Sequence, residues 1–483
     1  IESLLSHKQT CIYYEKEMSE IILNSDQEKI FEEIKKKNGN GLFFIEGAPG
    51  TGKTAFAKVL MKWYAEKYSV ESIKVTSHTG IAASNATSGT EFKGQTIHSL
   101  FKIGVQSETE TGIKGVQKDI SKDFNVLFVD EISMLPLSLF KLMNKVLQRD
   151  KNNNRPFGNI PVILMGDFKQ LSPIKDLSIQ ENEIFTQNFK KMELIKHVRN
   201  DNLEEQELLT RIRNHNIRQQ DINTLKSFIR PSPDPLSLHI MGENRQIDAH
   251  NDEIIKKHYL PWYTPIELEC KKTIHPDGQQ CYTIHRYIDT FLKSNYIKKN
   301  LLIKPGCRVM CRKNCEFMGV DGNMHNIFNG MIGKIISVVT VKTETDETDT
   351  ELVVKFNSYS INIMVRRIAF EFKTFGRDSK HIATIHQFPL HLCYAMTPWK
   401  SQGQTFNEPY VISYLPHKKY YAIFYVMITR ATSLRQCIYI DSTKPIHFTL
   451  EYFEKVPENS NVQGEPLRNL EYYMNKRRRR DDD

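Results

Sequence analysis

One octapeptide constrains the fold of this chain more than any other feature. Residues 47–54, Gly-Ala-Pro-Gly-Thr-Gly-Lys-Thr, fit the phosphate-cradling P-loop pattern G-x-x-x-x-G-K-[ST]. The apolar run 42–45 predicts a buried strand before it, and apolar residues recur at helical spacing over 56–63 after it. Such a strand–loop–helix points backbone N–H groups at an anion. We expect Lys53 to bind phosphate and Thr54 to hold Mg²⁺. A glycine-rich turn with a chance lysine is the alternative.

Length and composition indicate a folded protein of several domains. The chain has 483 residues, of which 40% are hydrophobic and 25% charged. The net charge of +9 is compatible with nucleic acid, but is a weak signal alone. The chain lacks an initiator Met, so we expect processing or a longer parent polypeptide.

Localisation is predicted from what the chain lacks. It has no apolar run of 18 residues and no signal-peptide core in its first twenty residues. Eight cysteines do not make a disulfide scaffold, which favours an intracellular, reducing site, either the nucleus or a cytoplasmic viral replication site. The charged stretch 476–483 is typical of a solvated tail.

One cysteine–histidine cluster is a candidate metal site. Cys270, His275, Cys281 and His285 could supply two sulfurs and two imidazoles to zinc. Their spacing does not match a standard finger, and an ordinary exposed hairpin is the favoured interpretation. Three further cysteines at a spacing of four, in the probable strand 307–315, are interpreted as structural.

The first third of the chain has the pattern of a parallel α/β domain. Four nearly all-apolar runs predict strands buried on both faces: 42–46, 73–76, 126–129 and 162–165. Each run ends at a polar cluster. In open α/β sheets, ligands bind beyond the carboxyl ends of the strands, so four such clusters predict one site.

The rest of the chain changes character twice. Residues 191–256 carry helical patterns, with Asn202 as an expected N-cap. Residues 300–372 are rich in Val, Ile and Thr and contain turn signals, which predicts an inserted β-rich module with an acidic loop over 344–350. Apolar strand and helix patterns return over 389–441.

Two polar clusters after predicted strands suit phosphoryl transfer. Asp130 and Glu131 follow an apolar strand, as in a Walker B arrangement, where Asp130 would hold Mg²⁺ and Glu131 would polarise the attacking water. Gln170 could reach a γ-phosphate or its water, because an amide both donates and accepts. Asp167 would support it. Surface turns are the alternative for both clusters.

The order of the motifs resembles the PIF and RecD-like branch of superfamily 1 DNA helicases. The matching segments occur in family order: 25–27, 79–83, 96–100, 130–134, 166–173, 194–199, 400–405 and 425–431. They span most of the chain, and the 79–83 and 400–405 motifs are the more specific ones. Viral helicase–primase helicases share this motif order.

The resemblance implies a role for each matching residue. The ATP-binding set would be Gln27 as the adenine-reading residue, Gly47, Ala48, Pro49, Gly50, Thr51, Gly52, Lys53, Thr54 and Gly403, with Thr54 and Asp130 on the metal. The catalytic set would be Lys53, Glu131, Gln170, Arg199 and Arg430, the two arginines stabilising charge on the transferring phosphoryl group. The nucleic-acid-binding set would be Thr79, Gly80, His98, Ser99, Phe168, Trp399, Lys400, Ser401 and Gln404.

Some positions depart from the family pattern. Trp399 replaces the usual histidine; its ring can still stack on a base but cannot titrate. Ser172 and Thr429 are mild replacements. The stretch 85–94 is longer than usual, which puts the geometry of the strand-separating pin in doubt.

The expected architecture is α/β, with two RecA-like P-loop domains and a barrel-like insertion. The expected boundaries are 1–190 for the first domain, with a short insertion over about 102–122; 191–256 plus 389–450 for the second; 257–388 for the insertion; and 451–483 for a tail.

The expected function is an ATP- and Mg²⁺-dependent 5′-to-3′ helicase acting on single-stranded and forked DNA in replication, repair or recombination. Primase or single-strand-binding protein would be its partners. The alternatives are a single-strand translocase that unwinds weakly, a helicase–primase scaffold subunit, and a P-loop ATPase independent of nucleic acid.

Overall fold

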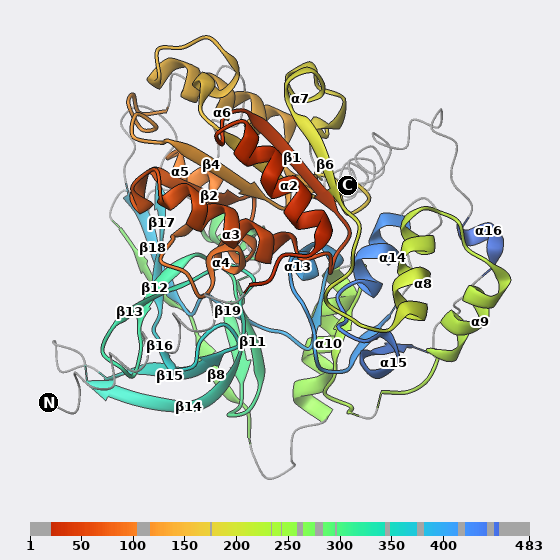
Figure 1. The fold of residues 1–483 in the computed structure, drawn as a ribbon. Coiled ribbons are helices and arrows are strands. Elements are labelled where there is room, and N and C mark those ends of the chain that lie inside the picture. Colours follow the sequence, from red (N-terminus) through yellow and green to blue (C-terminus); the bar gives the residue numbers. More distant parts are fainter. Residues whose placement is uncertain are drawn as a thin grey trace, which may run out of the picture. The chain divides into compact units, whose positions relative to one another are not determined.

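The computed structural model of the chain falls into two compact units (Figure 1). It describes residues 21–103, 116–173, 176–232, 234–242, 244–257, 264–275, 284–294, 297–342, 348–373, 381–413, 421–441 and 449–453. Unit 1 lies within Ile1–Arg230, Ser401–Glu408 and Leu415–Asp483, and unit 2 within Pro231–Lys400 and Pro409–Tyr414. Among the helices of these described ranges, none is long and apolar enough to cross a membrane.

A six-stranded parallel sheet forms the centre of unit 1 (Figure 1). Its strands, in spatial order, are β3 (Gly94–Thr96), β2 (Ile73–Ser77), β4 (Val126–Asp130), β5 (Val162–Gly166), β1 (Leu42–Gly47) and β6 (Lys190–Leu194). The four apolar runs of the sequence are thus confirmed as neighbouring strands. Their carboxyl ends share one edge of the sheet because all pairs are parallel.

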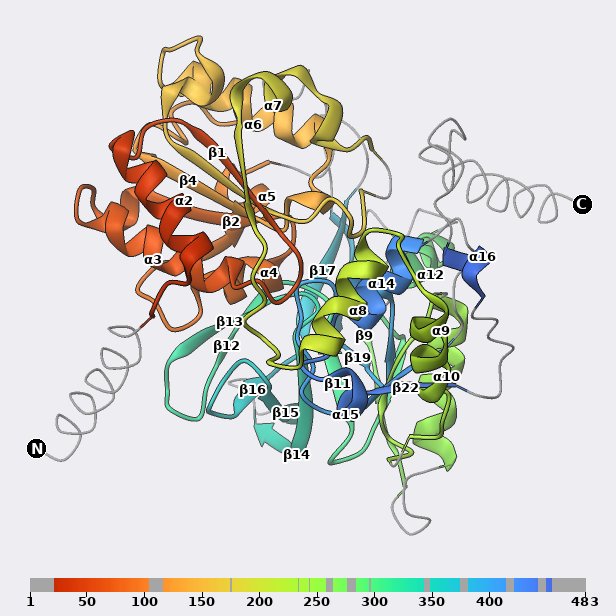
Figure 2. The ribbon, with the colours of Figure 1, turned by 45° about the vertical axis from the view of Figure 1, so that its right-hand side comes forward.

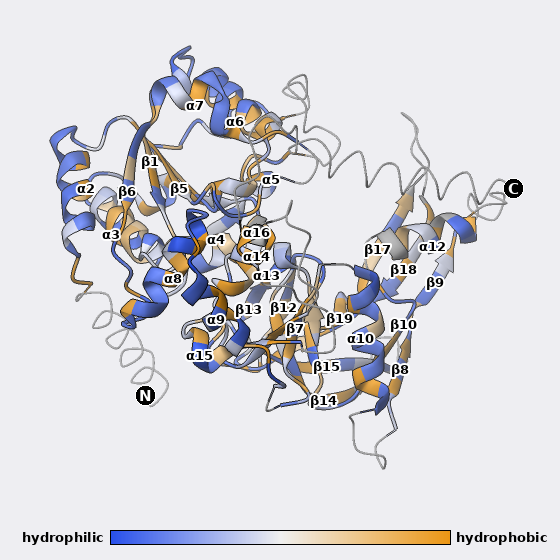
Figure 3. Cartoon of the chain, turned by 90° about the vertical axis from the view of Figure 1, so that its right-hand side faces the viewer, coloured by the Kyte–Doolittle hydropathy of each residue, from blue (hydrophilic) through white to orange (hydrophobic). Residues whose placement is uncertain are grey.

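Helices cover both faces of this sheet, as Figure 2 shows from the side. One layer holds α2 (Ser25–Lys36), α3 (Lys53–Ala65) and α4 (Gly80–Thr87), and the other holds α5 (Ile97–Leu100), α6 (Leu137–Asp150) and α7 (Glu183–Asn188). Successive side chains of β1 point to opposite faces of the sheet. Phe43 and Ile45 pack against the first layer of helices, and Phe44 packs against the second. In Figure 3 the strands of this sheet are therefore largely orange, whereas α2 is mostly blue.

Among the described residues, unit 1 also contains two helices that follow the sheet in sequence and four elements from the last part of the chain. They are α8 (Leu203–Arg213), α9 (Gln219–Ser227), α14 (Tyr421–Ile428), α15 (Leu434–Cys437), β22 (Ile438–Ile440) and α16 (Leu450–Phe453). Asn202 caps α8 as predicted, since its side chain accepts from Glu205 N at 3.1 Å. The buried Glu205 carboxylate in turn accepts from the backbone N–H groups of Leu434 and Arg435 at 2.8 and 3.2 Å. This carboxylate holds α8 to α15 across more than 200 residues of sequence.

Antiparallel sheets dominate unit 2. The largest contains β16 (Ile363–Val365), β15 (Thr348–Phe356), β14 (Ile332–Lys342), β11 (Arg308–Cys311) and β19 (Leu390–Leu392), in that order. A second contains β17 (Ile368–Lys373), β18 (His381–Gln387) and β9 (Lys271–Ile274), against which α12 (Ile284–Ser294) packs. The remaining pairs are β8 (Ile266–Glu269) with β10 (Asn300–Ile303) and β12 (Cys315–Met318) with β13 (Met324–Ile327).

A short parallel group completes unit 2. Strand β7 (Leu238–Ile240) lies between β20 (Ala395–Met396) and β21 (Tyr410–Ile412). Helix α10 (Asn244–Lys257) follows β7, and α13 (Pro398–Ser401) follows β20. The buried Asn251 side chain of α10 accepts from the backbone of Tyr394 and Ala395, at 2.7 and 3.1 Å. The predicted class, α/β with an added β-rich part, is therefore confirmed.

Two local predictions in the β-rich part are wrong. The acidic loop expected over 344–350 is too long, because Thr348–Thr350 already belong to β15, where Lys271 and Arg367 pair with the acidic Asp349. The strand expected over 307–315 is interrupted, because Cys311 ends β11 and Cys315 begins β12. The composition of a short segment does not show which distant lysine or arginine neutralises Asp349, nor that a strand ends at Cys311 and another begins at Cys315.

The other predictions in this region are placed rather than tested. The thiol of Cys270 lies in the apolar core under α12, and His275 Nε2 is 2.9 Å from Thr384 Oγ1. Cys281 lies outside the described residues, as do 104–115 of the expected insertion and 454–483 of the expected tail. The domain boundaries stay a prediction. They group α8 and α10 together, whereas the compact units separate those helices.

Removing the Glu205 carboxylate should destabilise unit 1. We expect Glu205→Ala to lower the free energy of unfolding by about 1–3 kcal/mol, because the N–H groups of Leu434 and Arg435 lose a buried acceptor. Urea unfolding followed by circular dichroism measures this. Glu207→Ala on the same helix is the control, since Glu207 is exposed and pairs only with Arg211 on that helix. Equal effects of the two variants would contradict the prediction.

Candidate nucleotide site of unit 1

The P-loop lies between β1 and α3, as predicted. Its backbone turns through two left-handed glycines, Gly50 at φ +90° and Gly52 at φ +80°. A side chain at Gly52 would also come within 2.8 Å of Gln27 Nε2 and 2.9 Å of Val198. Glycine is therefore required here both for conformation and for space. The result is a loop whose N–H groups precede the N-terminal end of a 13-residue helix.

Lys53 is the first residue of α3 and is almost fully buried. Its ammonium group donates to the carbonyl oxygens of Gly47 and Ala48, at 2.5 and 3.1 Å. Burial lowers the pKa of Lys53, while the charges of Glu131, Asp167 and Asp130 act to raise it. These contacts hold the ammonium group inside the loop that would surround a phosphate. Thr54 follows it, half-buried, in the first turn of α3.

The two Walker B carboxylates differ in environment. Asp130 ends β4 and is buried, and its Oδ1 accepts from Glu131 N at 2.8 Å. Burial and the charge of Glu131 raise the pKa of Asp130 well above its ordinary value. A divalent cation would offset this buried negative charge, so the carboxylates of Asp130 and Glu131 suit the binding of such an ion. Glu131 itself has a left-handed backbone, with φ +53° and ψ +48°.

Gln402 orients the Glu131 side chain. Its amide nitrogen donates to Glu131 Oε2 at 3.2 Å and to Ser133 Oγ at 2.9 Å. Next to it, Gly403 has φ +76°, and its carbonyl accepts from Asn85 at 3.0 Å. The family resemblance of the sequence implies a role for the neighbouring residues Ser401, Gly403 and Gln404 but none for Gln402. Its position inside a matched motif was the available signal.

Arg430 and Gln170 meet in the interior of unit 1. Arg430 is 2% exposed and donates to Gln170 Oε1 at 3.1 Å. The same guanidinium donates to Thr429 Oγ1 at 2.9 Å and to the carbonyls of Val426 and Gln404. Five donors are thus largely occupied and the side chain is rigidly placed. The predicted arginine and the predicted phosphate-sensing amide are in direct contact.

Asp167 connects β5 to elements that the sequence did not associate with it. Its fully buried carboxylate accepts from Arg213 of α8, at 3.1 Å, and from the Tyr425 hydroxyl of α14, at 3.0 Å. Burial acts to lower the pKa of Arg213, but the charge and hydrogen bond of Asp167 leave it above its ordinary value. Burial and Asp167 also raise the pKa of Tyr425. Tyr425 lies in the matched segment 425–431, which was the available signal for it, whereas Arg213 has no local sequence signature because its partner is distant in the chain.

Two further predicted residues border the P-loop. The Gln27 amide lies 3.4 Å from the Gly52 carbonyl and also closes the capping box of α2 with Asn24. Arg199 donates to the carbonyl of Thr429 at 3.3 Å, and Val198 N donates to the Gly50 carbonyl at 2.8 Å. Loop and arginine therefore approach each other within unit 1.

The predicted nucleic-acid residues of unit 1 have mixed surroundings. Thr79 caps α4 through its hydroxyl, Gly80 is buried behind it, and Ser99 is exposed at α5. The half-buried His98 ring lies 6.4 Å from the ring of His78. The Phe168 ring packs against Phe44 and Phe185 in the core, with centroids 5.2 and 5.5 Å apart. A role for Phe168 in stacking on a base stays a prediction.

The predicted residues near 400 belong to α13 and the turn after it. Trp399 and Lys400 are half-buried, whereas Ser401 is fully buried. Gln404 follows the left-handed Gly403, and its carbonyl accepts from Arg430 at 3.3 Å. The backbone of this motif therefore helps to hold the Arg430 guanidinium.

Comparisons with known proteins agree with this geometry. The PIF1-like helicase family model matches residues 22–231. The chain is 35% identical over 162 residues to the ATP-dependent DNA helicase RRM3 of Saccharomyces cerevisiae, covering 32% of this chain and 21% of that protein. It is 24% identical over 472 residues to the ATP-dependent DNA helicase Pif1 of Campylobacter jejuni, covering 90% and 96%. The chain spans less than half the length of RRM3 and of the Pif1 helicase of Psychrobacter, 46% of which it covers.

Solved structures share the fold. The Pif1 helicase from Candida albicans has a TM-score of 0.70 at 23% identity, covering 94% of this chain and all of that one. Bacteroides Pif1 bound to single-stranded DNA has a TM-score of 0.62 at 22% identity, covering 94% and 98%. At these identities the likeness establishes the fold and nothing finer. Residues 22–231 of this chain are therefore similar to the PIF1-like helicase family.

Proposed function

We propose that this chain is an ATP-dependent DNA helicase that moves 5′ to 3′ on single-stranded DNA and unwinds duplex. The observation that carries the proposal is the contact between Arg430 and Gln170 in the unit that holds Lys53 and Glu131. The match of residues 22–231 to the PIF1-like helicase family model and the relatives' names, ATP-dependent DNA helicase, support it. The polarity rests on the resemblance of the motifs alone.

In this proposal each side chain of the site has one task. Lys53 exchanges its carbonyl partners for phosphate oxygens, Glu131 orients and polarises a water molecule, and Arg430 neutralises charge that develops on the phosphoryl group. Thr54 and Asp130 would hold Mg²⁺, which neutralises phosphate charge when bound. Gln402 keeps the Glu131 carboxylate in place throughout.

Residues outside the nucleotide site bind the nucleic acid in this proposal. They are Thr79, His98, Ser99, Trp399 and Lys400, which contact the single strand as the resemblance implies. A charged groove with stacking side chains binds single strands with little sequence preference. Partnership with a primase or a single-strand-binding protein, in a reducing intracellular setting, is part of the proposal and is supported by the motif order and the cysteine content.

ATP hydrolysis tests the catalytic assignment. We expect Glu131→Gln to lower single-strand-stimulated turnover by about 10²–10⁴-fold, because the water loses its polarising carboxylate. Lys53→Ala should abolish turnover through lost phosphate binding. Phosphate release is measured with and without oligothymidine, and a forked duplex then separates helicase from translocase. Wild-type turnover that ignores DNA would identify a P-loop ATPase independent of nucleic acid.

Gln402 should act through Glu131. We expect Gln402→Ala to lower kcat by on the order of 10–100-fold with little change in KM for ATP, because a misplaced carboxylate costs rate and not nucleotide affinity. Steady-state kinetics with saturating oligothymidine measures both constants. Gln220→Ala, at an exposed position on α9, is the control. A rise in KM at constant kcat would assign Gln402 to nucleotide binding instead.

A further inference from the structure

The turn between β11 and β12 brings two cysteine thiols of unit 2 together. Cys311 ends β11 and Cys315 begins β12. The Sγ atoms of Cys311 and Cys315 lie 3.0 and 3.2 Å from the same atom, the carbonyl oxygen of Lys313. Because both sulfurs contact one oxygen, they also lie close to each other. A continuous strand, as the sequence predicts for this stretch, would not bring them together; the chain reversal does.

Strand pairing holds the backbone of both cysteines in place. The Cys311 N–H donates to the Met331 carbonyl at 2.9 Å, and the Cys311 carbonyl accepts from Gly330 N at 2.7 Å. Cys315 lies opposite Ile327 in the antiparallel pair of β12 with β13. Neighbouring segments therefore fix the two ends of the turn, and a bond between the sulfurs requires rearrangement of the turn alone.

The two thiols are coupled through a hydrogen bond. In its thiolate form Cys311 accepts this bond from the Cys315 thiol, which lowers the pKa of Cys311 although burial acts to raise it. The same bond, together with burial, raises the pKa of Cys315. The backbone of the turn and the charge of Arg312 also favour the Cys311 thiolate. Cys311 therefore carries more of the reactive thiolate form than an isolated thiol does.

Three other cysteines have different surroundings. Burial raises the pKa of Cys307 and of Cys393 to about 12, and burial also raises the pKa of Cys270. Such thiols stay protonated and unreactive. Cys315, in contrast, is half-buried and follows the exposed Lys313 closely in the turn, so a small solute can reach its sulfur.

We propose that Cys311 and Cys315 form a reversible disulfide when the protein meets a hydroperoxide. Across the ranges that the structure describes, no group of three or more His, Cys, Asp and Glu side chains is placed to hold a metal ion, so oxidation is the chemistry that suits this close pair of thiols. In a reducing compartment such a disulfide is transient, and a dithiol reductant restores the pair. The inference goes beyond the proposed function and does not depend on it.

The oxidation balances with peroxide as the only oxidant. The Cys315 sulfur attacks one peroxide oxygen, the O–O bond breaks, and the departing hydroxide takes the Cys315 proton to become water. The Cys311 thiolate then attacks the sulfenic acid left on Cys315, the S–S bond forms and hydroxide leaves. Two electrons pass from the two sulfurs to the peroxide.

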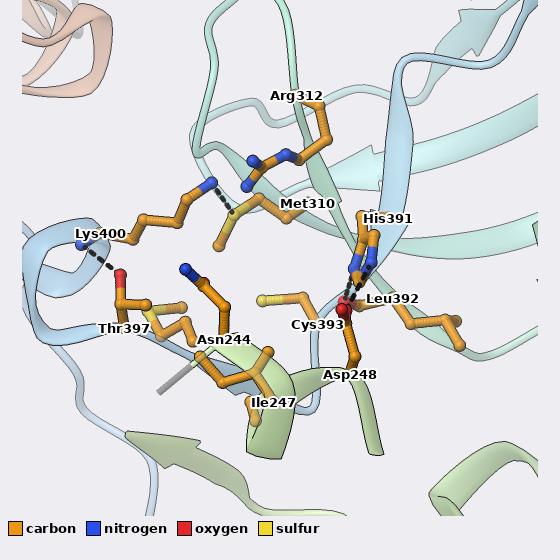
Figure 4. A pocket seen from close by; sticks show the side chains of 12 residues that line it. Asn244, Ile247, Asp248, Met310, Arg312, His391, Leu392, Cys393, Thr397 and Lys400 are labelled. Atoms are coloured by element: carbon orange, nitrogen blue, oxygen red, sulfur yellow. Dashed lines mark hydrogen bonds and ion pairs between the residues drawn. The ribbon is translucent and has the colours of Figure 1, made fainter. Parts of the chain in front are cut away.

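The disulfide would tie the end of β11 to the beginning of β12 across residues 312–314. Arg312, the first of them, lines the pocket that Figure 4 shows between the beginning of α10, strand β11 and the segment from β19 to α13. Its backbone N–H donates to the Pro389 carbonyl at 2.8 Å. Oxidation therefore changes the turn that positions Arg312 beside this pocket.

Peptide mapping of the full chain tests the proposal. Trypsin cleaves after Arg312 and Lys313, so the two cysteines fall on separate peptides, 309–312 and 314–334, which a disulfide links. The reduced protein is treated with a stoichiometric amount of hydrogen peroxide, the remaining thiols are blocked with N-ethylmaleimide, and the digest is analysed by mass spectrometry without reductant. We expect the linked peptides after peroxide and their separation after dithiothreitol.

Variants separate the roles of the two sulfurs. We expect Cys311→Ser to retain a sulfenic acid on Cys315, which dimedone traps, because no thiolate remains to attack it. Cys315→Ser should yield neither the linked peptides nor a dimedone adduct, since the remaining Cys311 is fully buried. Cys281→Ser, at a cysteine outside the described residues, is the matched control and should leave the linked peptides unchanged. Circular dichroism melts establish that each variant folds.

The wild-type protein decides the question even if a variant does not fold. The proposal is wrong if both thiols still react with N-ethylmaleimide after a treatment that oxidises glutathione in a parallel sample. It is also wrong if Cys311 or Cys315 is linked to another cysteine instead. ATP turnover with oligothymidine is measured separately, so a missing disulfide leaves the proposed function untouched, and missing turnover leaves the disulfide untouched.

Discussion

The parallel pairing of β1, β4 and β5 is the constraint on which unit 1 depends. Parallel strands bring their carboxyl ends to one edge of a sheet. The register places Glu46 opposite Gly166 and Ser77 opposite Asp130. The P-loop, the Walker B carboxylates and the loop of Gln170 therefore begin at the same level. Only the residues from other segments, such as Gln402 and Arg430, must be brought there by the packing of the rest of unit 1.

Buried charge is the second theme of the site. Lys53, Asp130, Asp167 and Arg430 are all less than 10% exposed, and isolated burial of any of them would be costly. Hydrogen bonds offset this cost. Asp167 accepts from Arg213 and Tyr425, Asp130 accepts from the backbone N–H of Glu131, and Lys53 and Arg430 donate to backbone carbonyls and to Gln170. Because each charge has directional partners, the network also fixes the position of α14 against the sheet. Because Gln170 accepts a hydrogen bond from Arg430, a movement of the Gln170 side chain would also move the guanidinium of Arg430.

Unit 2 differs from unit 1 because antiparallel sheets dominate it. Its antiparallel sheets are held by alternating side chains, and its polar groups gather where α10, β11 and α13 approach one another. Arg312 and Lys400 both line the pocket shown in Figure 4, where the pairing of β11 with β19 and of β20 with β7 sets their segments. The cationic pocket is thus a consequence of sheet register in this unit.

The sequence by itself determined the main strands of unit 1 and the motifs that surround the candidate nucleotide site. Strands buried on both faces are apolar throughout, and a phosphate-binding loop needs glycines and a lysine at fixed spacing. Both patterns can therefore be recognised within one short segment of sequence. The tertiary structure alone decided which distant groups support them. Gln402 on Glu131, Arg213 and Tyr425 on Asp167, and Glu205 on α15 are contacts between residues far apart in the chain. The β-strand character of Thr348–Thr350 also depends on partners outside its own stretch. Such pairings leave no periodic pattern, because their geometry comes from how the sheets and helices pack.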